Sequence, residues 1–303
     1  MKTNITNISL LIARLALTLT LLVFIFSKVS PNSVWQVLVT ANRIYILLAG
    51  MLLFPYIFLK SYKWYLLVKE LHGKNTFWDT MRLYLQKSTL TLSAASWIDK
   101  AITIVKSKNG KLKTKSVGSI DKMSELWIVF FFVLLGGQRL LTGYNPVIII
   151  LVLAVILLFL YQFRRFNNAI SRFVPFKVLK KILRGFTLAS WPLSNIILVL
   201  SFLSMSVYFL QAYLLLSAFQ SITITTILMV FPLVLLTNLV PVTIGSLGIR
   251  EGVAIYLLSQ FGVPAGVAVS VSLLLFLFDT VIPGVLGSIL FSFKSKSHVK
   301  KNK

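Results

Sequence analysis

Two adjacent side chains of opposite charge, Arg250 and Glu251, interrupt a strongly apolar part of this chain. They are the first candidates for chemistry. A guanidinium can bind a phosphate or carboxylate through two parallel hydrogen bonds, and Glu251 offers a contact to amines or sugar hydroxyls. An ionisable residue at membrane depth is costly and usually has a function. If the neighbouring helices cross a membrane completely, Arg250 and Glu251 are instead ordinary charges at its surface. The sequence leaves both interpretations open.

Asp279 is another candidate, because it lies in the last long apolar run, one helical turn before Pro283. It could pair with Arg250 across a helix bundle. It could also hydrogen-bond the carbonyl groups that the proline leaves without a donor. The residues alone do not favour one alternative.

The sequence has few of the residue types that bind metals or cofactors. The chain has no Cys, which excludes thiol catalysis and thiolate metal sites, and its only histidines are His72 and His298. We therefore expect no cofactor and no metal. An enzyme would have to use Asp99, Glu251 or Asp279 as its acid or base. We expect that the protein is not an enzyme.

The composition identifies a polytopic membrane protein. Of the 303 residues, 57% are hydrophobic and only 13% are charged, whereas a soluble domain carries about 25% charged residues. Lys and Arg number 31 against 7 Asp and Glu, and the basic residues stand in short stretches between apolar runs. That arrangement favours anionic lipid rather than nucleic acid as the partner.

A helix needs about 20 apolar residues to cross the hydrocarbon core of a bilayer. The fold we expect is an all-α polytopic membrane protein, a single integral membrane domain over residues 1–303. The first run lacks a small-x-small cleavage pattern, so we expect a retained helix rather than a signal peptide. The six predicted full spans lie near residues 8–26, 44–63, 125–142, 147–163, 193–219 and 265–293.

The distribution of Lys and Arg predicts the orientation, because positively charged loops stay in the cytoplasm. The basic segments are 60–122, 164–184 and 294–303. The connections 28–43 and 139–146 are poor in charge and fit the outer side. Both termini are then cytoplasmic. We expect the protein itself in the plasma (inner) membrane. Within the basic segments, 77–85 and 170–186 have the pattern of amphipathic helices on the membrane surface, with solvated basic loops as the alternative.

One region, 225–261, does not fit a plain span. Its apolar halves, 225–240 and 249–261, have about 16 and about 13 residues, roughly 24 Å and 20 Å as helices. Between them stand Pro241, Gly245 and Gly248, which break helices. We expect a re-entrant pair of broken helices. Their freed backbone groups are tolerated at depth only beside protein or a water-filled cavity, which makes the break a candidate site.

At this break the sequence resembles a known family. The run from Asn238 to Pro241, the run from Gly245 through Gly252, and Gly262-Val263-Pro264 together resemble the signature of the lysylphosphatidylglycerol synthase transmembrane region, also called flippase-like. The resemblance extends over the chain in span order. It implies an inverted repeat of two broken regions. In the first half the matching stretch is 92–100, where Asp99 fits the acid but the proline and glycines are replaced.

Family members that make aminoacylated lipid carry a cytosolic transferase domain, and this chain stops soon after its last span. The resemblance therefore implies only the membrane half: a flippase or transporter of a polar-headed amino- or glycolipid in cell-envelope biogenesis. Without a nucleotide-binding loop, transport would be driven by a gradient, the membrane potential or a partner. The candidate head-group ligands are Arg250, Glu251, Asp99, Asp279 and Asn238, with Pro241, Gly245, Gly248 and Pro283 forming the breaks.

The expected partners are an anionic phospholipid or glycolipid, the membrane itself and envelope-synthesis enzymes, with no nucleic acid. Two other functions are compatible with the residues. The chain could be a non-catalytic subunit of an envelope lipid or polysaccharide synthesis complex, or a lipid-modifying membrane enzyme. An interaction assay separates the subunit from the transporter, and no metal-ligand spacing accompanies the carboxylates that an enzyme would need.

Overall fold

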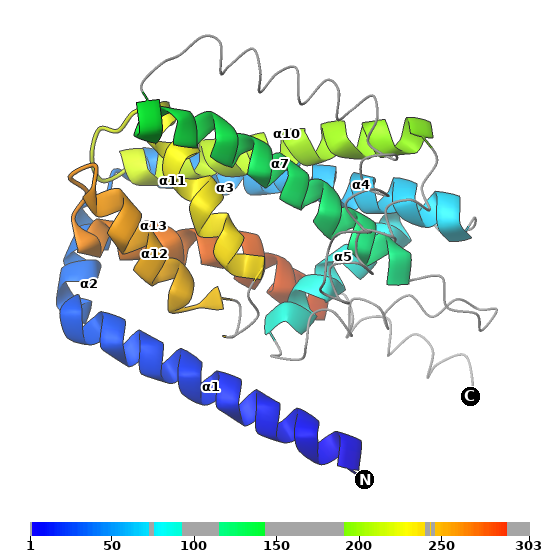
Figure 1. Cartoon of the computed structure of the whole chain (residues 1–303), viewed down its shortest axis with the longest axis horizontal. Helices are drawn as coiled ribbons and strands as arrows, with labels where there is room; N and C mark the ends of the chain where they lie inside the picture. The colour runs from blue at the N-terminus through cyan, green and yellow to red at the C-terminus, as the bar shows by residue number, and fades with distance from the viewer. Residues whose placement is uncertain are drawn as a thin grey trace.

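A computed structural model describes residues 2–72, 76–92, 115–142, 191–239, 243 and 246–289. These residues form helices and no strand, which confirms the all-α prediction for the described part of the chain (Figure 1). The helices are α1 (Lys2–Lys28), α2 (Pro31–Thr40), α3 (Arg43–Met51), α4 (Leu53–His72), α5 (Phe77–Leu92), α7 (Lys115–Thr142), α10 (Trp191–Ser217), α11 (Ile224–Leu236), α12 (Ile249–Ser259) and α13 (Ala265–Phe276). A short 3-10 turn, η1 (Thr237–Leu239), follows α11, and a π-helical segment, η3 (Leu277–Val281), continues α13.

Three of the described helical segments are long and apolar enough to cross a membrane. They are Arg43–Glu70, Leu193–Ser217 and Ala265–Ile289, and they match the predictions near 44–63, 193–219 and 265–293. A fourth is obtained if Leu15–Lys28 and Pro31–Thr40, which meet at 73°, count as one broken span. The described residues thus contain three or four candidate spans.

The predicted total of six spans is not confirmed. The prediction near 125–142 lies in α7, whose first half carries Lys115, Asp121, Lys122 and Glu125, and α7 is not among the candidate spans. The prediction at 147–163 lies outside the described residues, as does the predicted amphipathic helix 170–186.

Local sequence signals explain several helix starts. Ser30 caps α2 by accepting a hydrogen bond from the Ser33 N–H at 3.2 Å, and Pro31 occupies the first helical position, where no donor is needed. Asn42 caps α3 by accepting from the Ile44 N–H at 3.1 Å. The charge-poor connection 28–43 is therefore mostly helical, because it contains α2. This helix is set at an angle to α1.

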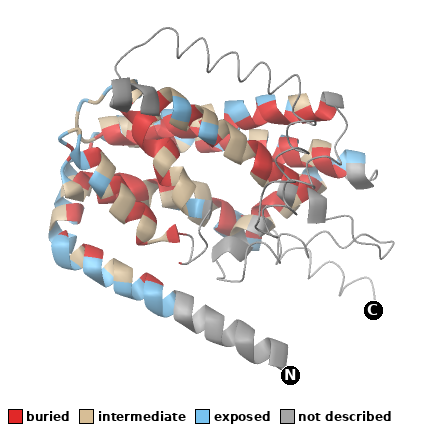
Figure 2. Cartoon of the chain, in the orientation of Figure 1, coloured by how far each residue is buried: buried red, intermediate tan, exposed pale blue. Residues whose placement is uncertain are grey.

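The main hydrophobic core lies between α10, α11, α12, α13, α7 and the α3–α4 segment, and buried residues concentrate there (Figure 2). A close helix approach joins α7 to α11. A Cβ added to Gly136 would lie 2.4 Å from the Leu228 carbonyl oxygen. Pro232, four residues after Leu228, has no N–H to offer that oxygen. The glycine therefore lets α7 pack against the part of α11 where the backbone is exposed.

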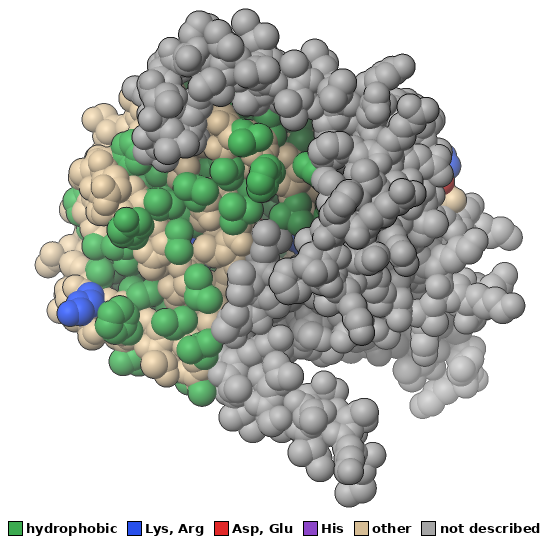
Figure 3. Space-filling view, viewed as in Figure 1, with side chains coloured by type: hydrophobic (Ala, Val, Ile, Leu, Met, Phe, Trp, Pro, Cys, Tyr) green, Lys and Arg blue, Asp and Glu red, His purple; other side chains and the backbone are tan. Residues whose placement is uncertain are grey.

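The amphipathic segment predicted at 77–85 is helical and forms the first part of α5. It packs against α4 through Tyr84 and Leu85, while Trp78 in its first turn is exposed. Other exposed apolar side chains, such as Phe54 and Leu47, lie on the candidate spans. In the face shown in Figure 3, hydrophobic side chains are spread over the whole described surface, as expected for a surface that contacts lipid.

Candidate functional site

The charged pair Arg250–Glu251 lies inside the helix bundle, at the start of α12. Arg250 is 5% exposed and Glu251 1% exposed, so both charged side chains are buried within the protein. Arg250 donates from Nε to the Ser272 hydroxyl at 3.1 Å, and from Nη2 to the Ser272 carbonyl at 2.6 Å and to Glu251 Oε1 at 3.2 Å. The Ser272 hydroxyl donates to Glu251 Oε1 at 3.0 Å. We call Arg250, Glu251 and Ser272 the arginine cluster.

The arginine cluster leaves part of the guanidinium unused. A guanidinium has five N–H donors, and only Nε and one terminal nitrogen are bound in this cluster. Among the described residues, Nη1 has no hydrogen-bond partner. The face of the group lies over the Phe276 ring at 5.2 Å, a cation–π geometry. Arg250 is thus held by contacts at Nε, Nη2 and the Phe276 ring, while the second terminal nitrogen has no partner among the described residues.

The backbone before α12 has the unusual geometry that the broken-helix prediction required. Gly248 has a φ of +87° and Ser246 a φ of +60°. A side chain at Gly248 would also meet α1, because an added Cβ would lie 2.6 Å from the Leu21 Cβ. The Gly248 N–H donates to Glu251 Oε2 at 2.6 Å, so Glu251 caps the helix that begins after the turn.

The two helices on either side of the break are short. α11 has 13 residues and α12 has 11, roughly 20 Å and 17 Å long against a hydrocarbon core of about 30 Å. They pack against each other. Their lengths agree with a pair of broken helices. Pro241 and Gly245 themselves lie outside the described residues.

Asp279 stands on the π-helical segment η3 and does not pair with Arg250. Its Oδ1 atom is buried and has no hydrogen-bond partner. It interacts electrostatically with Arg250 and with Lys60, but forms an ion pair with neither. Pro283, buried one turn later, interrupts the hydrogen bonding of the same helix.

The other predicted head-group ligands do not join this cluster in the described structure. Asn238 lies in η1, its side chain is exposed, and it makes no hydrogen bond to the described residues. Asp99 and the rest of the stretch 92–100, apart from the end of α5, lie outside the described residues. The inverted repeat that the resemblance implies stays a prediction.

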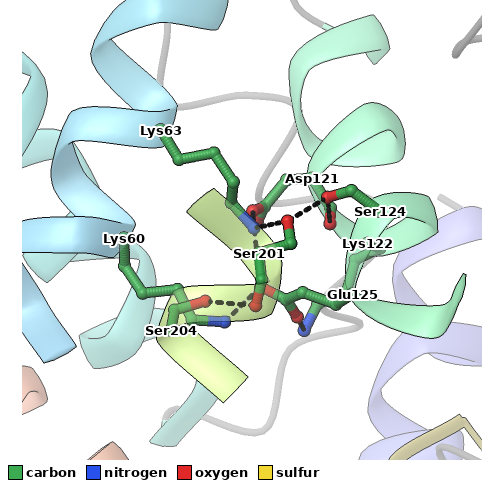
Figure 4. A network of polar contacts seen from close by, with 8 residues as sticks. All are labelled: Lys60, Lys63, Asp121, Lys122, Ser124, Glu125, Ser201 and Ser204. Atoms are coloured by element: carbon green, nitrogen blue, oxygen red, sulfur yellow. Dashed lines mark hydrogen bonds and ion pairs between the residues drawn. The ribbon is translucent and has the colours of Figure 1, made fainter. Parts of the chain in front are cut away.

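A second buried ionic cluster, which we call the lysine cluster, joins α4, α7 and α10 (Figure 4). Lys63 pairs with Asp121 at 2.6 Å and Glu125 at 3.2 Å. Lys60 also pairs with Glu125, and Lys122 does so at 3.2 Å. The third helix contributes hydroxyls: Ser201 accepts from Lys63 at 3.2 Å and donates to Ser124 at 2.8 Å, and the Ser204 hydroxyl donates to the Ser201 carbonyl at 3.0 Å.

The lysine cluster corrects two sequence-based interpretations. The sequence places Lys60 and Lys63 among the charges of a cytoplasmic loop, but they are 3% and 1% exposed and their side chains lie in the bundle interior. The carboxylates considered for function omitted Asp121 and Glu125, which are buried or nearly so. The available signal was the i, i+3 spacing of Lys60 and Lys63 and the i, i+4 spacing of Asp121 and Glu125, which places each pair on one helix face.

Within the described residues, no group of three or more His, Asp or Glu side chains could hold a metal ion. Both clusters instead combine cations with carboxylates and hydroxyls at short range. Such an arrangement can bind an anionic or zwitterionic group by rearranging its own ion pairs, and it can exchange protons.

Comparison with known families identifies one match. The model of the family described as "Lysylphosphatidylglycerol synthase TM region" matches residues 116–287. The matched range begins just before Asp121, includes Arg250, Glu251 and Asp279, and ends after Pro283. Comparison with curated proteins and with solved structures gave no match.

Proposed function

Because this chain belongs to the family of the lysylphosphatidylglycerol synthase transmembrane region, we propose that it binds a lipid with a polar head group and moves it between the leaflets of the plasma membrane. The lipid is an anionic phospholipid or a glycolipid used in cell-envelope biogenesis. The protein performs no chemical step on it. In this proposal the head group enters the bundle at the break between α11 and α12, where Arg250 binds its phosphate.

The observation that carries this proposal is the state of Arg250. A buried arginine is costly, and most are fully satisfied by partners. Here Glu251, Ser272 and the Phe276 ring hold one edge and the face of the guanidinium, and Nη1 has no partner among the described residues. A phosphate oxygen is the acceptor that suits a pre-oriented guanidinium. The broken helices nearby supply the gap in regular backbone that such a site needs.

Purified protein in vesicles tests the proposal. A fluorescent phosphatidylglycerol is placed in both leaflets, and a membrane-impermeant reductant quenches only the outer one. The wild type is expected to make the inner-leaflet label accessible to the reductant over time. Arg250→Ala should lower the rate of this process by about tenfold or more, because a charge-assisted hydrogen bond contributes about 1.5–3 kcal/mol. Arg250→Lys keeps the charge but not the planar fork, and should fall between the two.

Arg43→Ala is the matched control, because Arg43 is exposed at the start of α3. It should move lipid at the wild-type rate. Each variant is compared at equal amounts of monodisperse protein, so that a folding defect is not mistaken for a transport defect. If vesicles with the wild type, with Arg250→Ala and without protein all show the same rate, the proposal of lipid movement is wrong. If the wild type and Arg250→Ala show the same rate above the protein-free background, the role of Arg250 is wrong.

A further inference from the structure

The charges buried in the bundle do not balance within their own clusters. Lys60 and Lys63 pair with Glu125 and Asp121, and Arg250 pairs with Glu251. Lys122 adds a partly exposed cation at the edge of the lysine cluster, where the Glu125 carboxylate raises the pKa of its ammonium group. Asp279 is left over: it has no ion pair with any described residue, and its Oδ1 has no hydrogen bond.

Asp279 interacts electrostatically with one member of each cluster. Its electrostatic partners are Arg250 on α12 and Lys60 on α4. It also acts on the hydroxyl groups of Tyr56 on α4, Tyr84 on α5 and Tyr208 on α10, all three of which are buried. Among the described residues, the titratable groups that interact with Asp279 are therefore two cations already paired in their own clusters and three phenols.

The backbone around Asp279 is also irregular. In η3 the Ile282 N–H bonds to the Leu277 carbonyl, five residues earlier, and π-helical turns of this kind often occur at functional sites. Pro283, the next residue, has no N–H, so one carbonyl near Asp279 loses its intrahelical donor. Carboxylate and carbonyl oxygens are thus concentrated at one place, without the donors that would normally satisfy them.

From this arrangement we propose that Asp279 is a proton-binding site, and that protonation of Asp279 is coupled to lipid movement. A proton from water adds to the Asp279 carboxylate and gives a neutral carboxylic acid, and the same proton leaves when the carboxylate is formed again. The charge change alters how strongly Asp279 attracts Lys60 and Arg250. The arginine cluster can then release its lipid phosphate in one state and bind it in the other. The coupling rests on the proposed function, whereas the proton site does not.

The first experiment tests the proton site without reference to transport. Infrared difference spectra of the full-length protein in vesicles are recorded while the pH is changed. A carboxylic-acid carbonyl band that titrates in the wild type and disappears in Asp279→Asn supports the site. Glu70→Gln, which removes an exposed carboxylate from the end of α4, is the control and should keep the band. Absence of the band in the wild type, or its persistence in Asp279→Asn, overturns the proposal.

The second experiment tests the coupling. Lipid movement is measured in vesicles with and without a pH gradient, with the membrane potential clamped by potassium and valinomycin. We expect a several-fold dependence on the gradient in the wild type and none in Asp279→Asn, whose rate is compared with that of protein-free vesicles. Asp279→Glu should restore the dependence.

The remaining outcomes are distinguishable. If exchange of Na⁺ for K⁺ at constant pH, rather than the pH gradient, changes the wild-type rate, the proton proposal is wrong and the coupled cation is Na⁺. Wild-type lipid movement that is indifferent to both gradients overturns the coupling. A titrating Asp279 band in a protein that moves no lipid overturns the proposed function and the coupling together, and leaves the proton site standing.

Discussion

The lysine cluster and the arginine cluster are both buried ionic networks, but they are built differently. The lysine cluster joins three long helices, with partners such as Lys63 and Ser201 separated by 138 positions in the chain. The arginine cluster joins adjacent residues of one short helix to Ser272, 22 positions after Arg250. In the first, carboxylates and hydroxyls surround the lysine ammonium groups. In the second, a terminal nitrogen stays unused by the described residues.

This difference suggests different roles. A network that ties α4, α7 and α10 together resists their separation, since each ion needs partners from another helix. A network at the start of α12 can exchange its partners when the short helices shift. We infer that the lysine cluster fixes the framework and the arginine cluster meets the ligand, and the following variants test that assignment.

The largest effect is expected from Lys63→Met. Removing the ammonium leaves Asp121 buried without its 2.6 Å partner, and breaking a buried pair from one side costs about 3–5 kcal/mol. The free energy of unfolding should fall by that amount. It is measured on protein in a mild detergent, with a denaturing detergent as the titrant. The matched double variant Lys63→Met/Asp121→Leu should recover most of the loss, because an apolar pair needs no ionic partner. Wild-type stability in Lys63→Met would show that the cluster does not hold the framework.

Gly248→Ala should have the next largest effect. The added Cβ meets the Leu21 side chain at 2.6 Å, and the φ of +87° is strained for any residue with a side chain, at about 1–3 kcal/mol. Leu21→Gly in the same chain removes the Cβ that makes this contact but not the backbone strain, so the effect of Gly248→Ala is compared in the wild type and in the Leu21→Gly chain. We therefore expect thermal unfolding curves in which the double variant recovers only part of the loss. Complete recovery would mean that the turn before α12 does not need a glycine.

How much of this could be predicted from the sequence depends on the range of the interactions. The break before α12 was predictable, because Gly248 and the short apolar halves are local signals. The burial of Arg250 was one of two alternatives, because nothing local distinguishes a charge at the surface from one inside a bundle. The pairing of Lys63 with Asp121 was missed, since it depends on how α4 and α7 pack and lysines before a loop are normally counted as topology signals.

Gly136→Ala tests the framework at a point without charges. Its Cβ would lie 2.4 Å from the Leu228 carbonyl oxygen, so α7 and α11 must move apart, at about 1–3 kcal/mol. Gly252→Ala is the control within α12, because nothing lies within 4 Å of its added Cβ. A helical Gly→Ala change of that kind is neutral or stabilises by up to about 1 kcal/mol. Equal melting temperatures for the two variants would contradict the close packing of α7 on α11.

The smallest change, a single exposed cysteine, tests which side of the membrane lies nearer to the lysine cluster. The chain has no Cys, so single cysteines can be introduced at exposed Thr40, before α3, and at exposed Lys69, near the end of α4. The positive-inside rule predicts that an impermeant maleimide labels Thr40→Cys in intact cells and Lys69→Cys only after permeabilisation. Lys60 and Lys63 stand roughly 9–14 Å before Lys69 along α4, at 1.5 Å per residue. The predicted pattern therefore places the lysine cluster toward the cytoplasm, and the opposite pattern would place it toward the outer leaflet and reverse the predicted orientation of the chain.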